Sequence, residues 1–197
     1  MLWSIYQNRL VYSLTHLTRW NLLATFITSM ISADLSTLYY RGKIESRDKM
    51  STSMKIYWFM YNNVAIYACF ITVFYWNFIH DERDLTLNNV LTHITNCVGP
   101  LIDLMVVAHP YYVSHCIYPM MCAVSYLIFT FIYQACGGMN EHGKNYVYGV
   151  LDWKEKPMTA LLIAFIEITT AGILHITFFA LARVKIKIHR SLTKKKF

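Results

Sequence analysis

The stretch "NNVLTHITNCVGPLIDLMVVAHP", residues 88–110, decides the fold of this chain. It is long and apolar enough to cross a membrane, because a hydrocarbon core of about 30 Å needs about 20 helical residues. Yet it carries an imidazole, His93, and a carboxylate, Asp103. Ionisable side chains are costly in lipid, so they turn toward other helices or toward a water-filled cavity. The stretch therefore predicts one helix of a membrane bundle with polar contacts inside it.

Composition places the rest of the chain in the same environment. Of the 197 residues, 56% are hydrophobic and 15% are charged, whereas soluble domains carry about 25% charged residues. Apolar stretches of spanning length occupy residues 20–40, 56–78, 89–108, 116–136 and 159–183. The connectors between them are charged or polar, and the longest carries glycines and a proline. We therefore predict an all-α fold: a polytopic transmembrane helix bundle of five spans, or of six if a further helix precedes them.

This pattern divides the chain into three segments. Residues 18–183 form a single transmembrane bundle, and residues 184–197 form a basic tail. Residues 1–17 are apolar but interrupted by Gln7, Asn8 and Arg9, and they lack a small-residue cleavage site, which argues against a signal peptide. We expect an interfacial helix there, or the remnant of an incomplete amino-terminal helix.

The positive charges indicate which side each connector faces. The connector 41–55 holds five Lys or Arg residues and the segment 183–197 holds seven, whereas the opposite side of a five-span bundle collects six. Because cytosolic loops are enriched in Lys and Arg, we expect a cytosolic carboxyl terminus, with Lys43 and Lys194 on that side and Lys144 on the other. The final "KKKF" fits an anchor to anionic lipid headgroups, and it also has the form of a dilysine retrieval signal of the endoplasmic reticulum.

Two of the predicted helices carry polar stripes. Thr18 and Asn21 begin one in the first helix, and His93, Asn96 and Asp103 fall at offsets 0, 3 and 10 in the third. Contacts between membrane helices alone would account for the hydroxyls and amides of the first stripe. The imidazole and the carboxylate find hydrogen-bond partners in their own helix less readily. An ionisable residue inside a span is a functional candidate.

The depths of these residues suggest a site at one membrane face. Thr18 and His93 both lie near the non-cytosolic face, as does the connector that carries His142 and Asp152. A cavity opening there would join a hydroxyl, an imidazole and several hydrogen-bond donors. Asp103 lies about 15 Å deeper than His93, at about 1.5 Å per helical residue, so it is not the direct orienting partner of His93.

Several ordered motifs resemble the rolling stone family of multi-pass membrane proteins. The resemblance extends from Leu17 to Trp153 and rests on "LTRWNLLATF", "YNNVAIY", "VFYWNFIHDERD", "NNVLTHITN", "IDLMVVAHP", "YLIFTFIYQACGG" and "YVYGVLDW". It implies a role like the one for which that family is known, in contact between cells and in insect myoblast fusion. That role would place the chain in the plasma membrane, whereas the dilysine-like tail indicates the endoplasmic reticulum.

The same layout is more distantly similar to the androgen-induced family of integral membrane hydrolases, which cleave fatty acid esters of hydroxy fatty acids. The threonine motif of that family falls on "LTRWN" and implies Thr18 as nucleophile with Asn21 beside it. Its histidine motif falls on "HITNCVGPLID" and implies His93 with Asp103. A second histidine normally precedes that position, but Leu91 and Thr92 stand there in this chain.

Three hypotheses about function follow. The first is a non-catalytic membrane protein of rolling stone type. The second is an intramembrane hydrolase of fatty-acyl esters, in which His93 is the base that activates Thr18 and Asn21 or Asn96 donates to the oxyanion. The third is a small transporter or proton pathway, whose relay would consist of the ionisable residues inside spans: Asp34, Asp103, Glu167 and His175.

Other chemistry finds little support in the sequence. The five cysteines show no CxxC spacing and the eight histidines form no repeated pairs, so we expect no metal site and no cofactor. The basic residues concentrate beside the spans, which indicates lipid headgroups rather than nucleic acid as partners. Membrane lipids, and a lipid ester if the chain is an enzyme, are the expected partners, and the oligomeric state stays open.

Overall fold

The computed structural model describes residues 12, 14–44, 49–79, 86–107 and 109–194, and the predicted segment 1–17 falls largely outside them. The longer helices are α2 (Leu17–Tyr40), α3 (Thr52–Phe74), α5 (Asn96–Val106), α6 (Ile117–Ala135) and α7 (Pro157–Lys194). A π-helical turn, Tyr75–Ile79, continues α3, and a short helix, α4 (Leu87–Val90), leads through a second π turn, Leu91–Thr95, into α5. Short 3₁₀ turns, Val113–Cys116 and Gly149–Leu151, precede α6 and α7. No strand occurs among the described residues.

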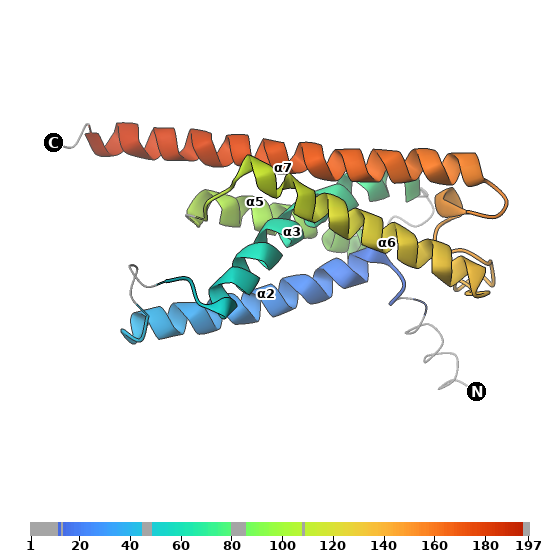
Figure 1. The fold of residues 1–197 in the computed structure, drawn as a ribbon, viewed down its shortest axis with the longest axis horizontal. Helices are drawn as coiled ribbons and strands as arrows, with labels where there is room; N and C mark the ends of the chain where they lie inside the picture. Colours follow the sequence, from blue (N-terminus) through green and yellow to red (C-terminus); the bar gives the residue numbers. More distant parts are fainter. Residues whose placement is uncertain (1–11, 13, 45–48, 80–85, 108, 195–197) are drawn as a thin grey trace.

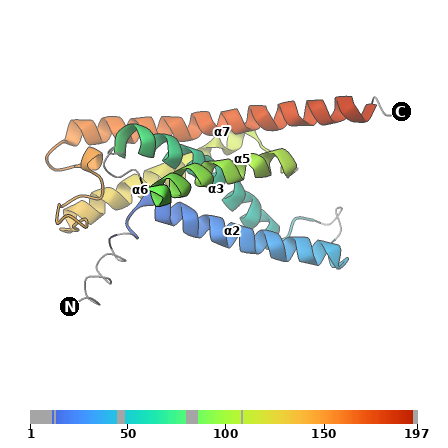
Figure 2. The ribbon, with the colours of Figure 1, turned by 180° about the vertical axis from the view of Figure 1, so that it is seen from behind.

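The helix α3 is the centre of the bundle. Figure 1 shows α7 along one edge and α2 along the opposite edge, with α3, α5 and α6 between them, and Figure 2 shows the same order from behind. The helix α3 contacts α2, α5, α6 and α7. Every residue from Asn62 to Ile71 is buried, which is typical of a helix that is surrounded on all sides.

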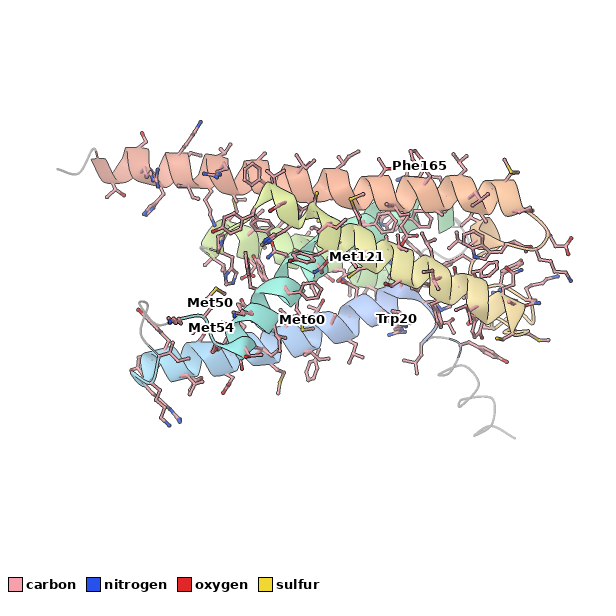
Figure 3. All side chains as sticks on the ribbon, viewed as in Figure 1. Trp20, Met50, Met54, Met60, Met121 and Phe165 are labelled. Carbon is pink, nitrogen blue, oxygen red and sulfur yellow. The ribbon has the colours of Figure 1, made fainter. Side chains whose placement is uncertain are left out.

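The outward faces are apolar, as a lipid environment requires. Met121 on α6 is 59% exposed and Phe165 on α7 is 68% exposed, and both are labelled in Figure 3. Among the described residues, four helices are long and apolar enough to cross a membrane, and a shorter apolar helix, Leu91–Val106, accompanies them. These helices coincide with the five predicted stretches, so the prediction of an all-α membrane bundle is confirmed.

The last helix continues beyond the predicted bundle. It has 38 residues and is therefore about 57 Å long at about 1.5 Å per residue, well beyond a hydrocarbon core of about 30 Å. The segment from Arg183 to Lys194 contains neither glycine nor proline and is rich in Lys and Arg, which favour helix. The basic residues expected in a tail at 184–197 thus extend α7 as far as Lys194, and residues 195–197 lie outside the described part.

A buried carboxylate locks the loop that joins α6 to α7. Asp152 is 6% exposed and accepts hydrogen bonds from the Gln134 amide (2.7 Å) and from the backbone N–H groups of Lys154 and Glu155. The Gln134 side chain in turn accepts from the backbone N–H of Trp153 at 2.8 Å. Burial alone would raise the pKa of Asp152, but these hydrogen bonds outweigh it and hold the pKa below its usual value.

The alternation of the helices predicts which connectors share a membrane side. The connector after α2 and the carboxyl end of α7 lie at one end of the bundle, and the α6–α7 loop lies at the other (Figure 1). Single cysteines at Lys43 and Lys187, in a background without the five native cysteines, should react with an impermeant thiol reagent from the cytosolic side. Lys144→Cys should react only from the opposite side. Labelling of all three from one side would contradict this topology.

The Asp152 lock predicts a pH-dependent stability. Asp152→Asn should lower the free energy of unfolding by about 1–3 kcal/mol, because three donors lose a charged acceptor. Since the pKa of Asp152 is lower in the folded state than in the unfolded state, its contribution is complete above the unfolded-state pKa and is lost as the pH falls through the folded-state value. Thermal unfolding in detergent at several acidic pH values measures this.

The matched control is Glu155→Gln, which changes an exposed carboxyl in the same loop and should leave the unfolding temperature near that of the parent. Equal unfolding temperatures for Asp152→Asn and the parent across the acidic range would refute a stabilising role for the lock.

Candidate functional site

Two tyrosines fix the beginning of α2. His16, the residue before the helix, makes no side-chain capping bond. Instead the backbone N–H of Leu17 donates to the hydroxyls of Tyr126 (3.1 Å) and Tyr148 (3.2 Å), and the Tyr126 hydroxyl donates to the carbonyl of Thr15 at 3.0 Å. The first helical N–H groups have no partner within their own helix, so these hydroxyls act as a cap supplied by distant parts of the chain. Thr18, the next residue, is thereby held against α6 and the α6–α7 loop.

His93 sits where π turns of two helices meet. It belongs to the turn Leu91–Thr95, is 8% exposed, and stacks face to face on Tyr75 of the π turn that follows α3, with ring centroids 3.5 Å apart. The Thr72 hydroxyl donates to the backbone carbonyl of His93. Single π turns inside α-helices are frequent at functional sites. Both π turns were invisible to the sequence analysis.

Thr18 and His93 line one cavity of about 710 Å³, which we name the Thr18–His93 cavity. Its walls come from α2, the end of α3, the π turn that carries His93, α6, α7 and the α6–α7 loop. The structure therefore places the two residues predicted to react on the wall of the same cavity, although 75 positions separate them in the sequence. His142, predicted to lie nearby, also lines this cavity, whereas Asp152 belongs to the buried loop lock.

A carboxyl group that was not predicted as part of this site also lines the cavity. Glu167 of α7 is 3% exposed, and its Oε1 atom has no hydrogen-bond partner among the described residues. The Nδ1 atom of His93 likewise has none. From the sequence, Glu167 was expected only as a relay residue of a transporter, because nothing in the α7 sequence indicates which helices Glu167 faces. The cavity thus offers a hydroxyl, an imidazole and a carboxylate.

The remaining predicted site residues lie elsewhere. Asn21 donates to Asn96 at 3.5 Å, between α2 and α5. Asn96 and Asp103 line a different cavity of about 660 Å³, between α2, α3 and α5, which we name the Asp103 cavity. The predicted stripe of His93, Asn96 and Asp103 is therefore divided between two cavities. A π turn closes its hydrogen bonds over one more residue than an α turn, so it rotates the residues that follow.

Nucleophilic chemistry is what the Thr18–His93 cavity can support. An alcohol needs a base to remove its proton, and a neutral imidazole is the usual base. No group of three or more His, Cys, Asp or Glu side chains suited to a metal ion occurs in the part of the chain that the structure describes.

Comparison with known proteins gives one consistent result. A family model described as "Protein rolling stone" matches residues 5–195. A curated Drosophila melanogaster protein, "Protein rolling stone", is 36% identical over 151 residues, which cover 70% of this chain and 55% of that protein. The chain thus spans about half the length of the curated relative. No solved structure matches.

The tyrosine cap predicts a specific loss of stability. Tyr126→Phe should lower the free energy of unfolding by about 1–3 kcal/mol. It leaves the Thr15 carbonyl without its donor and removes one of the two hydroxyls that accept from the Leu17 N–H. Thermal unfolding in detergent measures the effect. Tyr118→Phe is the control, because Tyr118 is 40% exposed on the same helix and should be neutral. Unchanged stability in Tyr126→Phe would show that α2 needs no such cap.

Proposed function

This chain belongs to the rolling stone family, and from that premise we propose that it is a multi-pass membrane enzyme that hydrolyses fatty-acyl esters of lipids in the Thr18–His93 cavity. One observation carries the proposal: Thr18 and His93, selected from separate helices by sequence alone, line the same cavity. We propose further that the carboxyl terminus is cytosolic, so the cavity lies toward the opposite face of the membrane.

The proposed reaction uses residues that line the cavity. His93 takes the proton of the Thr18 hydroxyl, and the Thr18 oxygen attacks the ester carbonyl. The alcohol leaves with a proton returned from His93, and the acyl group stays on Thr18. Water, activated by His93 in the same way, then releases the fatty acid and restores the threonine. Glu167 lines the same cavity and adds a buried carboxyl group to its wall.

The Asn21 and Asn96 amides are less suited to the oxyanion role expected of them. They bond to each other, and neither is among the residues that line the Thr18–His93 cavity. Tyr126 and Tyr148 do line it, and their hydroxyls lie at the first backbone N–H of α2. The amino end of α2 itself carries partial positive charge, which favours a developing anion beside Thr18.

The family match favours a second candidate, a non-catalytic role in contact or fusion between cells. In that case the polar cavity would bind a lipid without cleaving it, and the plasma membrane rather than the endoplasmic reticulum would be the working site. The transporter hypothesis lacks comparable support, because Asp103 and Glu167 line different cavities and His175 is bonded to the Tyr112 carbonyl.

A covalent probe tests the hydrolase proposal. The purified chain in detergent should react with a fluorophosphonate that modifies activated serine and threonine hydroxyls. Thr18→Ala should abolish the labelling, and His93→Gln should slow it by about 10²–10⁴-fold, the usual contribution of a general base. The rate of labelling, followed by in-gel fluorescence, is the measurement.

Two further variants separate chemistry from folding. Thr18→Ser keeps a hydroxyl and should remain labelled, whereas Thr25→Ala removes a hydroxyl on the same helix that does not line this cavity and should react like the parent. Labelling that persists in Thr18→Ala, or a well-folded parent that reacts with neither the probe nor lipid esters, would overturn the hydrolase proposal in favour of the contact protein.

A further inference from the structure

The Asp103 cavity contains polar groups that the protein leaves unsatisfied. Tyr61 and Asn96 line it, and the Tyr61 hydroxyl and the Nδ2 atom of Asn96 have no hydrogen-bond partner among the described residues. Tyr61 is 6% exposed and Asn96 is 8% exposed, so water outside the bundle does not serve them. A buried polar group without a partner costs about 1–3 kcal/mol. The two atoms themselves are buried behind the cavity wall, so they mark this side of the bundle as polar, and the groups that reach the cavity decide what it can bind.

The wall of this cavity carries one carboxyl group, that of Asp103, and no Lys or Arg side chain. Among the described residues, no cation lies within ion-pair distance of Asp103. Lys185 of α7, the basic residue nearest this end of α5, donates instead to the backbone carbonyls of Leu104 and Val107.

Aromatic rings accompany the carboxylate. Tyr57 and Tyr61 line the cavity and interact electrostatically with Asp103. Contacts with His109, at 4.9 Å and 4.5 Å between ring centroids, hold the two rings. The Tyr57 hydroxyl is already engaged, with Ser32 at 3.2 Å and His109 at 2.9 Å. Tyr57 and Tyr61 therefore contribute their rings to the cavity wall, and neither contributes a free, accessible hydroxyl.

From these contacts we propose that the Asp103 cavity binds an organic cation, an amine or a quaternary ammonium group. A carboxylate beside tyrosine rings is the chemistry that recognises such groups, through charge and cation–π attraction. The volume of about 660 Å³ lies within the range of small-molecule sites, about 300–1,000 Å³. Thr28 and Ser32 of α2 also line this space, and their hydroxyls already donate to the Ala24 carbonyl and to the Tyr57 hydroxyl.

This inference goes beyond the proposed hydrolase, because it concerns another cavity and requires no reaction there. The cation has two sources, the headgroup of a choline or ethanolamine lipid and a free amine of the cell. The two share the chemistry that Asp103 recognises, and competition distinguishes them.

Equilibrium binding of radiolabelled choline to the purified chain in dodecyl maltoside tests the proposal. Choline should bind, and 3,3-dimethylbutanol, which has the same shape without the charge, should not compete. Asp103→Asn should weaken binding at least about tenfold, as should Tyr61→Leu, whereas Tyr61→Phe should weaken it less because it keeps the ring. The control is Asp34→Asn, which removes an exposed carboxylate of α2 outside the cavity.

Addition of phosphatidylcholine to the micelles identifies the source. Loss of choline binding as the lipid is added means that the headgroup occupies the site, and unchanged binding means that the site takes a free cation. Equal competition by unlabelled choline and its neutral analogue overturns the proposal. This comparison uses the parent protein alone, so its result does not depend on whether a variant folds. Absence of choline binding to a well-folded parent overturns it equally.

Discussion

In a bilayer, a polar group has no water to bond with, so each one must find a partner inside the protein or face a cavity. This constraint sorts the side chains of the bundle. Most hydroxyls satisfy it locally: Thr25 and Thr28 donate to backbone carbonyls one turn earlier, those of Asn21 and Ala24. Several buried imidazoles and carboxylates use distant partners instead: His175 bonds the Tyr112 carbonyl, and Asp152 accepts from Gln134. His93, Asp103 and Glu167 line the two cavities.

The buried helix α3 is subject to the same constraint. A helix buried on all sides can be apolar throughout, yet Asn62 and Asn63 lie in its middle. Each donates from its amide nitrogen to a carbonyl of its own helix, those of Trp58 and Phe59. The outer helices present Met, Phe, Leu and Ile to the surroundings instead, as Figure 3 shows for Met121 and Phe165. The bundle thus keeps polar atoms inside and apolar surface outside, the reverse of a soluble domain.

The sequence was sufficient to predict the helices and to place Thr18 and His93 at the same depth, and both line one cavity. Apolar length depends on composition alone, and membrane depth depends on counting residues from a helix end. It was insufficient to predict on which side of the helix the side chains after the π turn at Leu91–Thr95 lie. An ideal helical period places His93, Asn96 and Asp103 on one side, and the wider turn separates them. Glu167 was not predicted as a site residue, because the sequence of a helix does not show which other helices it faces.

That separation explains how one short helix accepts both His93 and Asp103. On a regular helix both groups would face the same side of the helix. With the π turn, His93 stacks on Tyr75 and lines the Thr18–His93 cavity, while Asn96 and Asp103 line the cavity beside α2 and the tyrosines of α3. Thr92, beside His93, lines both cavities and so marks the wall between them. Because His93 and Asp103 line different cavities, one short segment can carry the imidazole of the proposed hydrolase site and the carboxyl group of the proposed cation site.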